Sequence, residues 1–250
     1  TLIDLNMTKN IQIYLLILLA LISAAAFFFL GSKPNMDELK TSVAPAASLY
    51  PEAKSVSDKL NFIDDRSNKT HLSDVVNNKW ALLYFGYTSC PDVCPIDLSK
   101  INKAAQLMEN GDQLQVVFIS VDPDRDLGNL NNFAKAFNQS FKGLTAKEDG
   151  LMSISKTLGV YHEVVQSQKT AQEDHSNHNH SHGDHDDDSH KMVADEKPSS
   201  TKVAHYDVDH TSSYLLFNPE LELVALLTSP HEPAPMAEAL DKIIEALGQN

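Results

Sequence analysis

The hydrophobic pattern between residues 58 and 248 predicts buried strands that alternate with helices. Two continuous apolar runs of strand length, 80–85 and 114–121, are typical of central strands covered on both faces. After each run, apolar residues recur at helical spacing, over 95–109 and over 126–137. This alternation predicts a domain of the α/β class.

Further patterns extend this order at both ends. Residues 60–72 contain two short strand-like pieces around a polar turn, which predicts a β-hairpin ahead of the first long strand. After the second strand and helix, the pattern predicts a helix at 148–158, a strand beginning near Tyr161, a hairpin at 213–227 and a last helix at 235–247. The whole order is that of a thioredoxin-like fold with an extra N-terminal β-hairpin.

The N-terminal part of the chain has a different pattern. Residues 11–30 are apolar and carry no charge, and about 20 helical residues at ~1.5 Å each span the ~30 Å hydrocarbon core of a bilayer. The run continues through Phe27–Leu30, beyond the small residues 24–26 at which a signal peptide could be cleaved. We therefore predict one uncleaved transmembrane helix ahead of the α/β domain.

Two segments flank this helix. Residues 1–10 form a short flank in which Met7 reads like a natural start, so that residues 1–6 would be an upstream addition. Residues 31–57 are rich in Pro, Ala and Ser and are predicted to be a flexible tether. A single N-terminal anchor with the 58–248 domain outside is the simplest topology.

Residues 169–202 lack the apolar residues that a packed core needs. The segment contains six histidines interleaved with Asp, Ser and Asn, and its acidic residues outnumber its lysines. Burial of so little apolar surface cannot offset the entropy lost on folding, so we expect a disordered insertion on the domain surface. Two interpretations stay open: weak capture of Cu²⁺, Ni²⁺ or Zn²⁺, and a solvated polar linker.

Charge and cysteine content narrow the function classes. The net charge is -14, and Lys and Arg are scattered, which argues against nucleic acid as a partner. The chain has only 2 cysteines, too few for a disulfide scaffold. Because Cys90 and Cys94 are so close in sequence, they indicate either a redox pair or two soft metal ligands.

The segment Cys90-Pro91-Asp92-Val93-Cys94 lies between a predicted strand and a predicted helix. Pro95 suits the first turn of that helix, so Cys94 falls at its start, where free N–H groups and the helix dipole favour a thiolate. The spacing lets the pair close a disulfide and also lets the sulfurs splay around a metal. Two thiolates suit Cu(I), and an added imidazole makes Cu(II) reasonable as well.

His210 is the candidate third ligand. It precedes the strand predicted at 213–218, and in a thioredoxin-like fold the loop before that strand faces the start of the helix that carries the cysteines. His205 is an alternative to His210. The remaining histidines outside the insertion have no special context and are expected to be structural or solvated: His71, His162 and His231.

Three motifs in this order resemble the Sco/SenC family. They are residues 86–95 (GYTSCPDVCP), residues 120–126 (SVDPDRD) and residues 208–211 (VDHT). Within the second motif, Asp122 and Asp124 are expected to start the next helix, whose dipole they suit.

The resemblance covers about residues 55–165 and 203–248, and the histidine-rich insertion departs from it. It implies a thioredoxin-like domain on a membrane anchor, facing the periplasm from the inner (plasma) membrane. It also implies one copper ion, Cu(I) or Cu(II), bound by Cys90, Cys94 and His210. The implied role is a chaperone that delivers copper to the dinuclear copper site of cytochrome c oxidase or another copper protein, or that reduces the cysteines of that site.

A thiol–disulfide oxidoreductase that works without metal is the alternative function. Such proteins typically carry a cis-proline just before the strand that faces their cysteines, whereas residues 209–213 here contain His210 and no proline. That difference favours metal binding. The two activities can coexist, because the thiols must be reduced before they bind copper.

Overall fold

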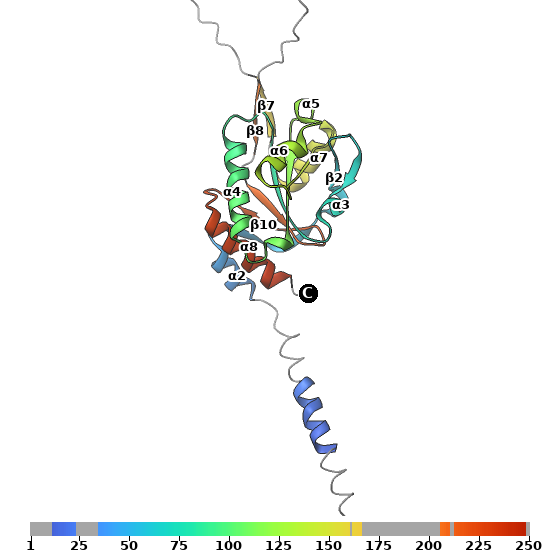
Figure 1. The fold of residues 1–250 in the computed structure, drawn as a ribbon, viewed down its shortest axis with the longest axis vertical. Coiled ribbons are helices and arrows are strands. Elements are labelled where there is room, and N and C mark those ends of the chain that lie inside the picture. The colour runs from blue at the N-terminus through green and yellow to red at the C-terminus, as the bar shows by residue number, and fades with distance from the viewer. Residues whose placement is uncertain (1–11, 24–34, 161, 167–205, 211–212, 249–250) are drawn as a thin grey trace, which may run out of the picture.

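The central feature of the fold is one six-stranded sheet with helices on both faces (Figure 1). The computed structural model describes residues 12–23, 35–160, 162–166, 206–210 and 213–248, of which 162–166 and 206–210 are described by their backbone alone. From one edge to the other, the strands of the sheet are β1 (Ala47–Ser55), β10 (Glu222–Leu227), β9 (Tyr214–Phe217), β4 (Trp80–Gly86), β5 (Leu114–Ser120) and β6 (Lys142–Leu144).

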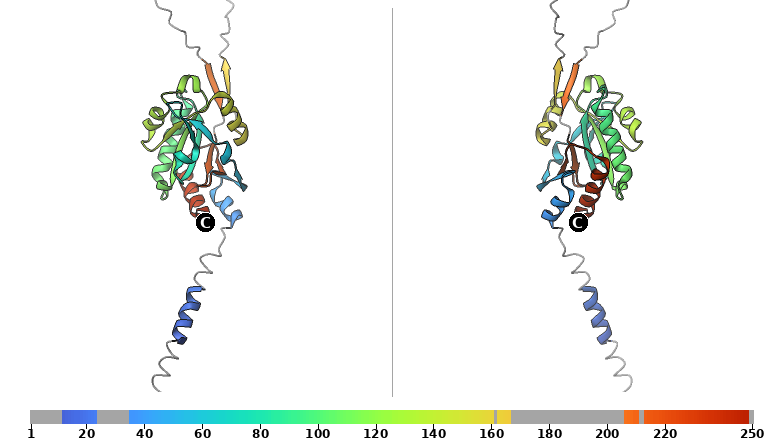
Figure 2. Two further views of the ribbon diagram at one scale, coloured as in Figure 1. Left: turned by 90° about the vertical axis from the view of Figure 1, so that its right-hand side faces the viewer. Right: turned by 90° about the vertical axis from the view of Figure 1, so that its left-hand side faces the viewer.

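The helices form two layers around this sheet. Figure 2 shows α4 (Val93–Leu107) and α6 (Leu130–Phe137) on one side, with α7 (Glu148–Leu158) and a small hairpin on the other. That hairpin joins β2 (Asn61–Ile63) to β3 (Lys69–His71). The remaining helices are α2 (Met36–Val43) and α8 (Pro233–Leu247), which pack against each other, and the short α3 (Leu72–Val76) and α5 (Pro123–Asp126).

The two predicted central strands are confirmed. Every residue of β4 and of β5 is buried, as their continuous apolar runs predict for strands covered on both faces. The two strands run parallel, with Trp80 opposite Leu114 and Gly86 opposite Ser120. Since parallel strands end at the same edge of a sheet, the loops that follow β4 and β5 emerge side by side.

The thioredoxin-like order is also confirmed, with different element boundaries. Helix α4 begins at Val93, which puts Cys94 inside the helix. The helix predicted at 126–137 is two helices, α5 and α6, because Gly128 between them has a φ of +94°, which no helix accommodates. A separate two-stranded sheet pairs β7 (His162–Gln166) antiparallel with β8 (Tyr206–His210), so residues 206–210 form a strand rather than the expected loop.

The prediction of a flexible tether at 31–57 was wrong. Within that range, α2 and β1 are regular elements, and β1 forms one edge of the sheet by pairing with β10. Four apolar residues of these elements are buried, namely Leu39, Val43, Ala47 and Leu49. Their helical and strand spacing was hidden by the surrounding Ala, Ser and Pro, which are typical of linkers.

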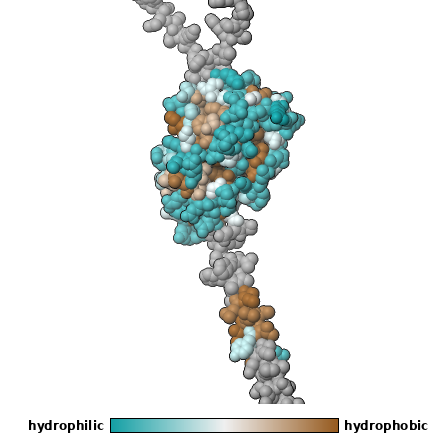
Figure 3. Space-filling view, in the orientation of Figure 1, coloured by the Kyte–Doolittle hydropathy of each residue, from teal (hydrophilic) through white to brown (hydrophobic). Residues whose placement is uncertain are grey.

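The predicted transmembrane helix is described in part. Residues 12–23 are helical, and the exposed apolar side chains of this helix make it the brown segment below the domain in Figure 3. Among the described helices, none combines the length and apolar character that crossing a bilayer requires. The rest of the 11–30 prediction, and the predicted disordered insertion at 169–202, lie outside the described residues.

Asp65 caps α6 from the turn of the first hairpin, and its loss should destabilise the fold. Its carboxylate accepts from the N–H groups of Leu130 (2.7 Å) and Asn131 (3.0 Å), while the N-cap residue Asn129 makes no side-chain cap bond. We expect Asp65→Ala to lower the free energy of unfolding by about 1–2 kcal/mol in urea titration, as for other lost caps. Asp58→Ala, which removes an exposed surface pair with Lys59, should change it by less than ~0.5 kcal/mol; equal losses would contradict this role.

Candidate metal-binding and thiol site

The cysteine pair lies at the junction between β4 and α4. Strand β4 ends at Gly86, and the loop turns so that the N–H of Cys90 donates to the carbonyl of Tyr87 (3.3 Å). Cys90 is half-buried in this loop, while Cys94 is the second residue of α4 and is fully buried. The two thiols therefore differ in access to solvent.

A glycine makes room for the buried sulfur. A methyl group at Gly86 would place its carbon 2.9 Å from the Cys94 sulfur and 3.2 Å from the ring of Phe118. Real carbon contacts are essentially never so short, so any side chain at this position would displace the thiol or the aromatic ring. Gly86 thus allows the close approach of α4 to β4 that buries Cys94.

Polar contacts join the two sulfurs. The N–H of Cys94 donates to the sulfur of Cys90 at 3.3 Å. Tyr84, from the middle of β4, acts on the thiol of Cys94 and lowers its pKa. The sulfurs are not linked in a disulfide. This arrangement brings together the two thiols that the sequence predicts as a pair.

The structure contradicts the expectation that Cys94 is a thiolate. Burial raises the pKa of the Cys94 thiol to about 12, although hydrogen bonds from Tyr84 and from the backbone of Tyr87 oppose the increase. The N–H at the start of α4 points to the sulfur of Cys90, not to that of Cys94. The helix start therefore contacts the first sulfur, and Cys94 stays a neutral thiol near neutral pH.

The backbone of His210 is described as the last residue of β8, opposite His162 of β7. The next strand, β9, runs antiparallel to β4, and its first residue Tyr214 contacts Tyr84 with ring centroids 5.3 Å apart. The chain therefore enters β9 at the edge where β4 ends.

The structure does not describe the side chains of His210 and His205. Where side chains are described, no three His, Cys, Asp or Glu residues are grouped as a metal site would require.

A buried polar cluster beneath the cysteines was not predicted. Asp97 of α4, Tyr214 and His231 are all buried, and the rings of Tyr214 and His231 stack with centroids 3.8 Å apart. Burial, and then the nearby carboxylate of Asp97, raise the pKa of Tyr214. Burial lowers the pKa of His231, whose Nε2 lies 3.1 Å from the carbonyl of Leu227. The only sequence signal was the position of Asp97 on the apolar face of its helix.

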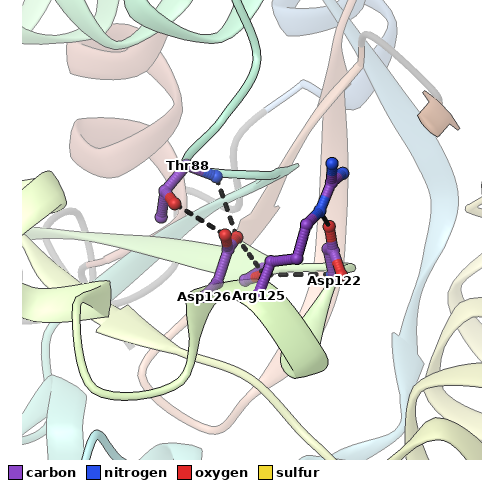
Figure 4. A network of polar contacts seen from close by, with 5 residues as sticks. Thr88, Asp122, Arg125 and Asp126 are labelled. Atoms are coloured by element: carbon purple, nitrogen blue, oxygen red, sulfur yellow. Dashed lines mark hydrogen bonds and ion pairs between the residues drawn. The ribbon is translucent and has the colours of Figure 1, made fainter. Parts of the chain in front are cut away.

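The second motif carries an ion pair beside the cysteine loop. Arg125 pairs through Nε with the buried carboxylate of Asp122, as Figure 4 shows, and its guanidinium lies 5.6 Å from the centre of the Tyr87 ring. Asp122 is the N-cap residue of α5 and Asp124 lies in its first turn, as expected. Asp122 makes no side-chain cap bond and pairs with Arg125 instead.

The two thiols should react at different rates. In the reduced, metal-free protein at pH 8, we expect iodoacetamide to alkylate Cys90 at least about ten times faster than Cys94, because Cys94 is buried and protonated. Peptide mapping by mass spectrometry over time measures both rates. Unfolding in guanidinium should make them similar, which is the control. Equal rates in the folded protein would show that Cys94 is more accessible than the structure indicates.

Comparison with known proteins places this site in a family context. A family model described as SCO1/SenC matches residues 50–183, a range that includes the cysteine loop. A SCO2-like protein of Rickettsia prowazekii is 30% identical over 176 residues, covering 68% of this chain and 84% of that protein. A protein of Stutzerimonas stutzeri named as a putative copper-binding protein is 29% identical over 148 residues, covering 58% of this chain and 69% of that protein.

Solved structures show the same fold. The chain is similar to Arabidopsis thaliana ScoI with copper bound, with a TM-score of 0.55 and 24% identity over 74% of this chain and 96% of that one. It is also similar to apo Sco1 from Thermus thermophilus, with a TM-score of 0.54 and 24% identity over 81% of this chain and 96% of that one. At this identity the likeness concerns the fold alone.

Proposed function

The chain belongs to the SCO1/SenC family, and on that premise we propose that it is a copper-binding metallochaperone. Its cargo is one copper ion, and its recipient is the dinuclear copper site of cytochrome c oxidase or another copper protein. The observation that carries the proposal is the pair of neighbouring thiols, Cys90 and Cys94, at the start of α4. Two soft ligands so close together are a donor set that suits copper.

The donor set fits either oxidation state. Cys90 and Cys94 supply two sulfurs for Cu(I), and we propose His210 as the third ligand, which adds the imidazole that Cu(II) favours. The antiparallel course of β9 beside β4 supports His210, because the chain enters β9 at the cysteine edge of the sheet. Since burial raises the pKa of Cys94 to about 12, copper binding must release the proton of this thiol.

Delivery requires that one ligand can be reached by the recipient. Cys90 is half-buried, and its neighbours Pro91, Asp92 and Val93 are exposed. Incoming thiols of a partner can therefore attack the metal from the Cys90 side, while Cys94 stays enclosed by the core. A stepwise exchange of ligands through Cys90 follows from this difference in exposure.

A thiol–disulfide reductase is the second candidate function. The half-buried Cys90 can attack a partner's disulfide, and the enclosed Cys94 can then close a disulfide with Cys90 and release the partner. In that step the pair gives up two electrons and two protons, and the partner's disulfide becomes two thiols. The unequal exposure of the two sulfurs is the observation that favours this activity.

We further propose that residues 11–30 anchor the chain to the inner membrane, with the folded domain that follows on the periplasmic side. The apolar run and the exposed apolar side chains of helix 12–23 support an anchor. A periplasmic domain would be placed where a membrane-bound oxidase exposes its copper-bearing subunit.

Copper titration of ligand variants tests the proposed function. The reduced wild type should hold one copper per chain, and Cys90→Ala or Cys94→Ala should weaken Cu(I) binding by at least about 100-fold, as expected when a ligand itself is lost. His210→Ala should weaken Cu(II) binding more than Cu(I) binding. Competition with a chromophoric Cu(I) chelator measures the affinities. Ser89→Ala removes an exposed neighbour and is the matched control; a reduced wild type without tight copper would refute the proposal.

Deletion of residues 170–200 tests the histidine-rich insertion separately. If its histidines capture metal weakly, the deletion variant should keep the tight copper and lose the additional weak equivalents of Cu²⁺, Ni²⁺ or Zn²⁺. Isothermal titration of both proteins distinguishes the two classes of binding. If the deletion variant binds the weak metal equivalents as the wild type does, residues 170–200 are a polar linker and not a metal-binding segment.

A further inference from the structure

Asp126 carries a buried carboxylate that joins the end of β5 to the cysteine loop. This residue is fully buried at the end of α5. Its carboxylate accepts from the N–H of Thr88 (2.8 Å), from the hydroxyl of Thr88 (2.6 Å) and from the hydroxyl of Ser120 (2.6 Å), as the dashed lines to Thr88 in Figure 4 illustrate. We call these three residues the carboxylate clasp.

The three groups that donate hydrogen bonds to the buried carboxylate of Asp126 are uncharged. In the part of the chain that the structure describes, no Lys, Arg or His forms an ion pair with Asp126, because the neighbouring Arg125 pairs with Asp122. A buried carboxylate is costly unless its oxygens are hydrogen-bonded. Two of its three donors belong to Thr88, so the carboxylate strongly disfavours any movement of Thr88 away from it.

The bonds to Thr88 lie outside the pairing of the two strands. The pairing of β4 with β5 extends to Gly86 opposite Ser120, and the N–H of Val121 donates to the carbonyl of Gly86 at 2.8 Å. The bonds to Thr88 begin where this ladder ends and attach only the loop that follows. They therefore act on the course of the loop rather than on the pairing of the strands.

The loop decides where the sulfur of Cys90 lies. Cys94 is fixed by its place in α4 and by complete burial. Cys90 lies in the loop itself, two residues after Thr88. Its N–H donates to the carbonyl of Tyr87, and its sulfur accepts from the N–H of Cys94. The separation of the two sulfurs therefore depends on this backbone bond and on how firmly Thr88 holds the course of the loop.

We propose that Asp126 is a positioning residue for the cysteine pair, acting through Thr88 to hold the sulfur of Cys90 at the separation from Cys94 that suits copper. This inference rests on the proposed copper function, because copper is the ligand concerned. It names Asp126 and Thr88 as residues that adjust the affinity for copper. Ser120 shares the same carboxylate and orients it toward the loop.

Variants of Thr88 test the clasp with little change in shape. Thr88→Val removes the hydroxyl donor at nearly constant volume, Thr88→Ser restores it, and Asp126→Asn replaces the charged acceptor. Thr157→Val is the matched control, because its hydroxyl donates to the carbonyl of Ser153 within α7, far from the clasp in sequence. Each full-length variant is measured for urea stability, for Cu(I) affinity and, without metal, for the equilibrium between its dithiol and disulfide forms in a glutathione buffer.

We expect Thr88→Val and Asp126→Asn to lower Cu(I) affinity at least about tenfold and to shift the glutathione equilibrium, the size seen when partners that orient ligands are lost. Thr88→Ser should recover both properties, and Thr157→Val should change neither. If Thr88→Val folds and keeps the wild-type affinity and equilibrium, the clasp is structural only and the inference is wrong, whatever its stability. A wild type that binds no copper would refute the proposed function, while the metal-free equilibrium would still decide whether the clasp positions Cys90.

Discussion

The parallel pairing of β4 with β5 is the constraint on which the site depends. Both strands are buried along their whole length, so a one-residue shift of register would move every side chain to the opposite face and disrupt the packing on both faces. Because parallel strands end at one edge, Thr88 after β4 and Asp126 after β5 meet although they are 38 residues apart in sequence. The strand pairing thus brings together two motifs that carry different parts of the site.

Within this frame, burial divides the roles of the two cysteines. A helix N-terminus stabilises a nearby charge by ~0.3–1 kcal/mol, which is less than one pKa unit. Burial raises the pKa of Cys94 to about 12, a larger effect, so desolvation decides the state of this thiol. The helix start acts on Cys90 instead, through the N–H of Cys94. The sulfur of Cys90 therefore remains accessible to partners, whereas the sulfur of Cys94 is enclosed by the core.

The sequence predicted most of the regular elements, because long apolar runs and helical spacing depend on local pattern. Strands β4 and β5 and helix α7 appear where expected. Prediction from the sequence failed where pairing with a distant segment decides the structure. Strand β1 gains its hydrogen bonds from β10, and the linker-like composition around this strand concealed it. In the site, the spacing of Cys90 and Cys94 predicted a pair, whereas the cluster of Asp97, Tyr214 and His231 draws on three elements and left no continuous signal.

The sequence by itself determined the α/β order, the family motifs and the identity of the two soft ligands. These follow from residue types and their spacing along the chain. Only the tertiary structure decided which thiol is buried, which sulfur receives the helix N–H, and that Asp126 bonds to Thr88. The physical reason is that burial and hydrogen bonding depend on distances between segments, and the packing of α4 over Gly86 and the alignment of β4 with β5 set those distances.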